Sequence, residues 1–157
     1  MSFGILFFRT FVSMFSKACE YGIRATLHIA AQSLQGKRVV LPEIANAIDS
    51  PEPFTAKILQ QLAKNKLVKS NKGPNGGFSI SEKDMERIKL KDLVLAIDGE
   101  GLFTECGLGL KTCNEHAPCP IHHTYKPIRT QIITMLENTS LKTLSVQLEA
   151  GDAVLKV

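Results

Sequence analysis

Three helix-like stretches followed by one glycine-rich hairpin are the feature that most constrains this fold. Apolar residues recur at helical spacing over residues 17–34, 41–48 and 54–65. Two strand-like runs, 67–70 and 77–80, then flank a turn that is rich in asparagine and glycine, residue types that readily adopt positive φ. This order of elements predicts a winged helix-turn-helix, a mainly α fold with a small β-hairpin wing.

Proline and glycine mark the turns between these helices. Gly36 ends the first predicted helix, and Pro42 lies in the first turn of the second, where proline is tolerated. Residues 49–53 contain two prolines, so we expect a turn there and a third helix that starts only at Phe54. In this motif the third helix enters the DNA major groove, and the hairpin tip contacts phosphates or the minor groove.

The residues after the hairpin predict a longer helix that has little of its own domain to pack on. A short helix over 90–98 is closed by Gly99, and a loop occupies 99–119. An amphipathic helix then runs to about Glu137, although Pro127 inside it predicts a kink or a later start. Its apolar stripe favours a dimerisation helix that packs against a second subunit, with packing inside one chain as the alternative.

Four segments follow from this pattern. Residues 1–13 form an apolar extension without the features of a secretory signal, and Met14 offers a second start of the chain. Residues 14–85 are the predicted DNA-binding domain. Residues 86–150 hold the cysteine loop, the dimerisation helix and a last short helix, and 151–157 are expected to be a flexible tail.

Composition is that of an ordinary globular protein and excludes few functions. Of the 157 residues, 44% are hydrophobic and 22% are charged. The net charge of +4 permits nucleic-acid binding without requiring it. Because the sequence shows neither an export signal nor an apolar run long enough for a bilayer, we expect a soluble cytoplasmic protein with no membrane partner and with reduced cysteines.

Three cysteines share the loop, with the spacing C-x6-C-x5-C. Cys106, Cys113 and Cys119 are surrounded by glycine, charge and proline, which favours metal ligands over core thiols. Thiolates suit iron–sulfur clusters and zinc, and three of them leave one coordination position for another group. The loop lacks the closely spaced cysteine pair that is typical of structural zinc, so an iron–sulfur cluster is favoured and zinc is the alternative. Cys19, outside the loop, is expected to be a small buried thiol.

The residues from about Met14 to Leu148 resemble the IscR/NsrR group of winged-helix transcription regulators, the Rrf-two family. The resemblance rests on the run 21–25 (YGIRA), on 59–68 (LQQLAKNKLV) and on the wing 72–78 (KGPNGGF), together with the cysteine loop. It implies a homodimer on a palindromic operator, with the three cysteines holding a cluster. Many relatives have one residue fewer between the first two cysteines, so whether the cluster is 2Fe-2S or 4Fe-4S stays open.

The resemblance implies two candidates for the fourth ligand. Glu20 matches the acidic residue that, in relatives sensing nitric oxide or redox state, reaches the cluster from the other subunit. His122 matches the histidine that follows the last cysteine by three residues in the IscR branch. Either group binds a soft centre more weakly than a fourth thiolate does, which would make the cluster labile. Glu20 is preferred, because it would join the first helix of one subunit to the loop of the other.

The predicted DNA contacts lie on the third helix and on the wing. Thr55 and Gln61 carry groups that can read base edges, while Lys57 adds attraction to phosphates. Lys72 and Asn75 lie in the wing. Lys72 stands where several relatives have arginine, and its more strongly hydrated charge predicts a weaker preference for the minor groove.

These features predict a DNA-binding transcription regulator that senses redox state, nitric oxide or iron–sulfur status. Two alternatives remain, a zinc-stabilised protein-interaction module and a cluster-free regulator that uses its thiols. An enzyme that uses Cys106 as a nucleophile is disfavoured, since the sequence offers no third residue to orient a histidine base.

Overall fold

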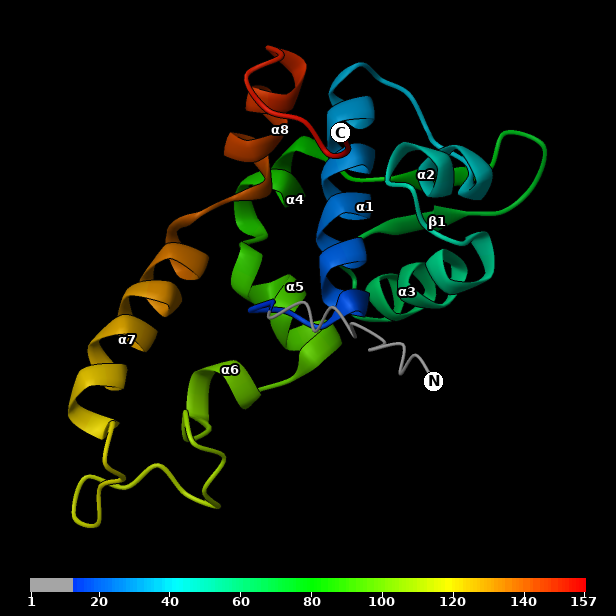
Figure 1. Cartoon of the computed structure of the whole chain (residues 1–157). Helices are drawn as coiled ribbons and strands as arrows, with labels where there is room; N and C mark the ends of the chain where they lie inside the picture. Colours follow the sequence, from blue (N-terminus) through cyan, green and yellow to red (C-terminus); the bar gives the residue numbers. More distant parts are fainter. Residues whose placement is uncertain (1–12) are drawn as a thin grey trace, which may run out of the picture.

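The computed structural model describes residues 13–157 and is mainly helical, with one small antiparallel hairpin (Figure 1). The predicted fold class is therefore confirmed. Apart from Ser13, the apolar extension predicted at 1–13 lies outside the described residues. The elements are α1 (Lys17–Leu34), α2 (Leu41–Ala47), α3 (Glu52–Lys64), β1 (Lys69–Asn71), β2 (Gly77–Ser79), α4 (Glu82–Arg87), α5 (Leu90–Asp98), α6 (Gly101–Thr104), α7 (His122–Asn138) and α8 (Leu141–Glu149).

Helix α1 is the centre of the core. It packs against α3, α5 and α8, and Figure 1 shows α7 extending away from it to one side. Ile29 of α1 and Leu59 of α3 are fully buried in the main cluster, together with Leu93 of α5 and Leu141 of α8. Each such side chain contributes about 1.5–3 kcal/mol on burial. Helices α5 and α8, which precede and follow the cysteine loop, therefore close the same core as the predicted DNA-binding helix α3.

The wing is held against the body by its second strand. β1 and β2 pair with Ser70 opposite Phe78, and Phe78 forms a further bridge with Val39, in the segment between α1 and α2. Gly77 has φ of 126°, and a Cβ there would lie 2.8 Å from the Val39 carbonyl oxygen. Only glycine allows both this conformation and this close approach.

Helix α3 begins two residues earlier than predicted, at Glu52. Pro51 is its N-cap and Pro53 lies within the first turn. The first backbone N–H groups of a helix have no intrahelical partner, so a proline there costs nothing. The prolines of 49–53 thus start the helix instead of delaying it.

Helix α7 likewise begins earlier than its proline suggested. It runs from His122 to Asn138 with Pro127 inside it, so the later start that we considered is wrong. Helices α4 and α6 were not predicted. None of the helices within residues 13–157 is long and apolar enough to cross a bilayer.

The last residues lie against α1 and α2. Leu155 packs on the main core, and its carbonyl oxygen accepts a hydrogen bond from Nη1 of Arg24 over 3.5 Å. Nζ of Lys156 donates to the carbonyl oxygen of Asn46 over 3.2 Å. These contacts hold part of the segment that we expected to be a flexible tail.

Candidate functional site

The cysteine loop connects α6 to α7 and lies at the end of α7 that is farther from α8 (Figure 1). Cys106 is buried, while Cys113 and Cys119 are half-buried, and all three are free thiols. The loop contains little regular secondary structure, so its conformation depends on the side chains that contact it.

Two buried polar side chains of α7 contact the middle cysteine. The Nδ1 atom of His122 lies 3.4 Å from Sγ of Cys113. Arg129 donates from Nη2 to the same sulfur over 3.4 Å, and its Nη1 donates to the carbonyl oxygen of Glu105. His122 is 3% exposed and Arg129 is 9% exposed. Helix α7 therefore supports the loop on both sides of Cys106.

The first cysteine is held in an environment that favours its thiolate. Backbone N–H groups of Leu108 and Leu110 lower the pKa of the Cys106 thiol, and Cys119 and the Arg129 charge act in the same direction. The N–H of Leu108 lies 3.4 Å from the Cys106 sulfur. Since the thiolate is the form that binds metal, this arrangement prepares Cys106 as a ligand.

The thiols of the loop and the imidazole of His122 are donors that suit a soft metal centre. Within the described residues of one chain, however, they do not converge on a single point. Within residues 13–157, no three Cys, His, Asp or Glu side chains converge closely enough to hold a metal ion. The Nε2 atom of His122 is buried and has no hydrogen-bond partner in the described part of the chain. Buried polar atoms nearly always have a partner, so this nitrogen, on the ring whose Nδ1 contacts Cys113, is suited to a metal.

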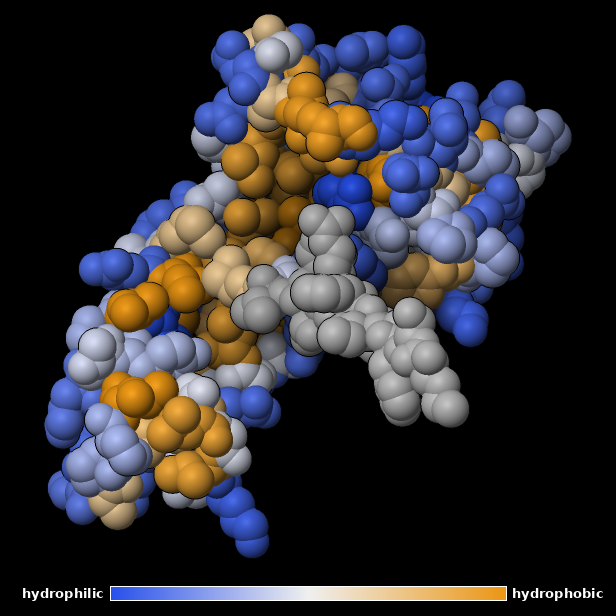
Figure 2. Space-filling view, viewed as in Figure 1, coloured by the Kyte–Doolittle hydropathy of each residue, from blue (hydrophilic) through white to orange (hydrophobic). Residues whose placement is uncertain are grey.

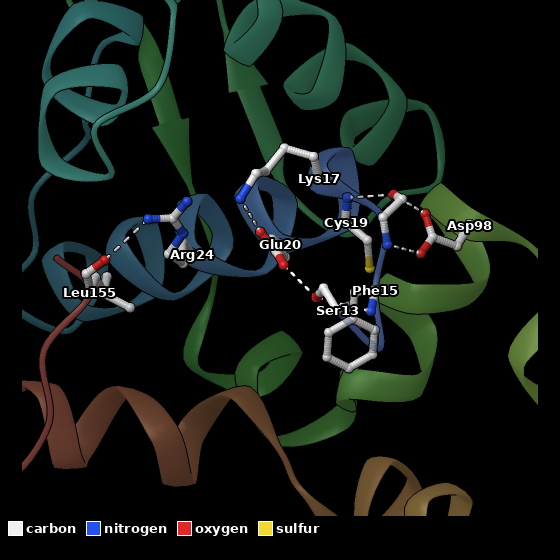
Figure 3. Close-up of polar contacts among 9 residues, drawn as sticks. Ser13, Phe15, Lys17, Cys19, Glu20, Arg24, Asp98 and Leu155 are labelled. Atoms are coloured by element: carbon white, nitrogen blue, oxygen red, sulfur yellow. Dashed lines mark hydrogen bonds and ion pairs between the residues drawn. The ribbon is translucent and has the colours of Figure 1, made fainter. Parts of the chain in front are cut away.

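Glu20 lies at the start of α1 and faces solvent in part. Figure 3 shows its carboxylate between Lys17 and Ser13. Nζ of Lys17 lies 2.7 Å from Glu20, whose side chain is 25% exposed. The hydrogen bonds from Lys17 and Ser13 lower the pKa of Glu20, so the carboxylate is ionised at neutral pH.

The start of α1 is also hydrogen-bonded to the end of α5, which precedes α6 and the loop. The Ser16 N–H donates to Asp98 over 2.9 Å, and the Ser16 hydroxyl donates to the other carboxylate oxygen. The same hydroxyl oxygen caps α1 by accepting from the N–H of Cys19 over 3.0 Å. Cys19 is fully buried, as predicted, and burial together with Asp98 raises its pKa to about 12. This thiol is therefore inert at neutral pH.

A surface hollow of about 480 Å³ connects the two regions. Its lining includes Met14 and Ser16 at the start of α1, Asp98 of α5, and Cys106 and Tyr125 at the loop. The first cysteine of the loop thus lies beside the same part of the body as Ser16.

The predicted reading helix presents fewer free polar groups than expected. Thr55 is fully buried, and its hydroxyl bonds to Ser50 Oγ and to the carbonyl oxygen of Pro51, so its predicted base contact does not fit the structure. Gln61 is exposed, but its Nε2 donates to the carbonyl oxygen of Ala96 over 2.6 Å. Lys57 is exposed on α3.

The wing carries its predicted polar residues on the outside. Lys72 and Asn75 are exposed, and the Asn75 carbonyl oxygen accepts a hydrogen bond from Arg38 over 3.0 Å. Sequence reasoning missed Arg38, whose only signal was the basic pair Lys37-Arg38 just before the buried Val39. Arg38 adds a basic side chain to the wing beside Asn75.

An apolar strip follows α7. Ile128 is 51% exposed and Met135 is 45% exposed, whereas Leu136 is fully buried against α5 and α1. Figure 2 shows apolar side chains gathered along the side of α7 nearest the body. One face of α7 therefore packs in its own chain, and a second apolar face remains available.

Residues 15–147 match the model of a protein family described as Rrf2, iron-dependent transcriptional regulator. The chain belongs to the Rrf2 family. A protein of Aquifex aeolicus described as an HTH-type transcriptional regulator is 32% identical to this Rrf2 protein over 133 residues, covering 83% of this chain and 90% of the relative. The regulator IscR of Photorhabdus laumondii is 28% identical over 125 residues, covering 80% and 74%.

Solved structures show the same fold for this Rrf2 protein. CymR (YrzC), the global cysteine regulator of B. subtilis, matches with a TM-score of 0.69 and 22% identity, over 83% of this chain and 95% of CymR. IscR of T. potens matches with a TM-score of 0.66 and 21% identity, over 88% and 90%. With family and fold both established, the chain is a transcription regulator of the Rrf2 type.

Proposed function

We propose that this Rrf2 protein binds a palindromic operator as a homodimer and senses redox state, nitric oxide or iron–sulfur status through a cluster held by Cys106, Cys113 and Cys119. The observation that carries the proposal is the buried His122, whose Nδ1 contacts Cys113 while its Nε2 lacks a partner in residues 13–157. An unsatisfied imidazole beside a thiol loop supports a ligand at that place. The family description as iron-dependent supports the same conclusion.

Two side chains remain candidates for the fourth ligand. Glu20 is the preferred one, supplied by the partner subunit, and its ionised and partly exposed carboxylate supports that role. His122 is the alternative, and within one chain it is the group beside Cys113. A bound cluster would supply one-electron chemistry and reactivity toward nitric oxide. Glu20 in turn would connect that centre to α1, on which the DNA-binding helices pack.

The proposed DNA interface combines α3 and the wing. Lys57 and Lys72 are exposed cations that would contact phosphates, and Asn75 is exposed at the wing tip. Gln61 could read a base only if its side chain left the carbonyl group of Ala96. The exposed apolar residues of α7, Ile128 and Met135, support the dimer.

A cluster-free regulator that uses its thiols is the second candidate. It is favoured by the absence, within residues 13–157, of three converging ligand side chains and by the lowered pKa of Cys106. Such a thiol would react directly with oxidants.

Anaerobic purification separates the two candidates. Visible absorbance with stoichiometric iron and sulfide supports the cluster, whereas a colourless protein with neither rejects it, and stoichiometric zinc would identify the zinc alternative. The variants Glu20→Ala and His122→Ala then identify the fourth ligand. Only the variant that has lost the ligating side chain should lose the cluster. His123→Ala, one position from His122 and exposed, is the matched control. A gel shift on the DNA upstream of the gene should respond to air or nitric oxide.

A further inference from the structure

Arg129 is a buried cation in an unusual setting. It is 9% exposed, in the middle of α7, and is the one buried Lys or Arg among residues 13–157. Its partners are the carbonyl oxygen of Glu105 and the sulfur of Cys113, and its guanidinium carbon lies 5.7 Å from the centre of the Tyr125 ring. The guanidinium group therefore bridges two parts of the loop that are separated by Cys106.

No carboxylate within residues 13–157 forms an ion pair with Arg129, and residues 1–12 contain neither Asp nor Glu. Moving a charged side chain from water into the protein interior is costly when no opposite charge lies beside it. The loop thiols are the ionisable groups on which the guanidinium group acts. Cys113 accepts its N–H, and the charge of Arg129 acts on Cys106 as well.

The other cation of α7 near the loop behaves differently. Lys126 lies three positions before Arg129, forms an ion pair with Glu115 of the loop, and is 47% exposed. Water screens this surface pair, so it contributes little. Arg129 is shielded from water and is paired with sulfur, so its charge acts on the loop at close range.

We propose that Arg129 is a positioning residue that fastens both parts of the loop to α7 and serves as the buried counter-charge of the centre held by Cys106, Cys113 and Cys119. The second role rests on the proposed function, and the first does not. Three thiolates give such a centre a net negative charge. Positive charge and N–H donors beside its sulfurs favour the reduced form, which carries one more negative charge.

The experiment compares full-length Arg129→Met and Arg129→Lys with wild type, using Lys126→Met as the matched control. The metal-free proteins are digested with trypsin, and cleavage after Lys111 is followed, since this is the one Lys or Arg between Cys106 and Cys119. The same proteins are then reconstituted anaerobically with ferrous iron and sulfide, and the reduction potential of the visible chromophore is measured. Far-UV circular dichroism checks that each variant is folded.

We expect Arg129→Met to be cleaved several-fold faster and its centre to be about tenfold harder to reduce, which corresponds to about 59 mV for one electron. Arg129→Lys should keep most of the reduction potential, because the positive charge remains. It should lose the protection from trypsin, because an ammonium group cannot bond to the Glu105 carbonyl oxygen and the Cys113 sulfur at once, as the planar guanidinium group does. Lys126→Met should match wild type in both measurements.

Equal cleavage and equal potential in Arg129→Met and wild type would overturn the proposal, as would a Lys126→Met variant that shifts as far as Arg129→Met. If Arg129→Met does not fold, unchanged protection in Arg129→Lys would overturn the fastening role. Should the wild type itself take up no cluster, the proposed function and the counter-charge role would both fail. The rate of cleavage at Lys111 in the metal-free proteins would still decide the fastening role.

Discussion

Gly22 is the position at which one added methyl group should disturb the contact between α1 and α5. A Cβ there would lie 2.2 Å from Cδ1 of Ile97 and 3.2 Å from Cγ2 of Ile58. Alanine inside a helix is worth about 1 kcal/mol relative to glycine. Overpacking costs about 1–3 kcal/mol, and with a middle value of about 2 the expected net loss of unfolding free energy for Gly22→Ala is about 1 kcal/mol.

The clashing atom can be removed by a second substitution. Ile97→Val deletes Cδ1 and alone should cost about 0.5–1.5 kcal/mol. In the double variant, the alanine methyl group fills the vacated space, so the two changes should couple favourably by about 1–2 kcal/mol. Urea unfolding at fixed protein concentration measures all four proteins, since any dimer would make the midpoint depend on concentration.

Gly101→Ala provides the control, because the atoms nearest to its added Cβ would be those of the Glu105 carboxylate, at 3.1 Å, at the end of a side chain that can move. Its unfolding free energy should stay within about 0.5 kcal/mol of wild type. If Gly22→Ala were more stable than wild type and showed no coupling to Ile97→Val, the packing of α1 on α5 would differ from the structure described above.

Three further perturbations test other regions. Because the pKa of Cys19 is raised from 9.0 to about 12, its stabilising contribution is complete below the ordinary value and is lost as the pH rises through this range. From about pH 9 to pH 10, wild type should lose about 1 kcal/mol more unfolding free energy than Cys19→Ala in urea titrations, and equal losses would contradict a buried thiol. Asp98→Asn weakens the bonds to Ser16 and should cost about 1 kcal/mol, whereas the exposed Asp152→Asn should cost less than about 0.5; equal effects would argue against the tie. Lys72→Ala should lower the slope of log affinity against log salt by about 1 in DNA titrations, and an unchanged slope would remove Lys72 from the phosphate contacts.

The helices that local chemistry specifies were predictable from the sequence. The stretches 17–34 and 90–98 form helices over those residues, because the apolar spacing and the end signals agree. Gly99 ends α5 with φ of 76°, a backbone conformation that is unfavourable for residues other than glycine. The wing was predictable for the same reason, since its turn residues suit only a hairpin.

The features that the sequence did not predict depend on tertiary contacts or on very short segments. Thr55 was expected to face DNA because its hydroxyl is polar, yet the preceding turn satisfies that hydroxyl inside the protein. Helix α6 spans only Gly101–Thr104, too short for a periodic signal. Arg129 was overlooked because a single arginine in an amphipathic helix gives no local sign that its charge will be buried.

Because α5 and α8 pack on α1 in the same cluster as α3, the segments before and after the cysteine loop share one packed unit with the predicted DNA-binding helices. Leu141, which follows the loop in sequence, is fully buried in the same cluster as Leu59 of the reading helix. A ligand that binds only the folded loop therefore stabilises the whole unit, by RT ln(1 + [L]/Kd). The melting temperature of α3 would then measure occupancy at the loop, without any DNA present.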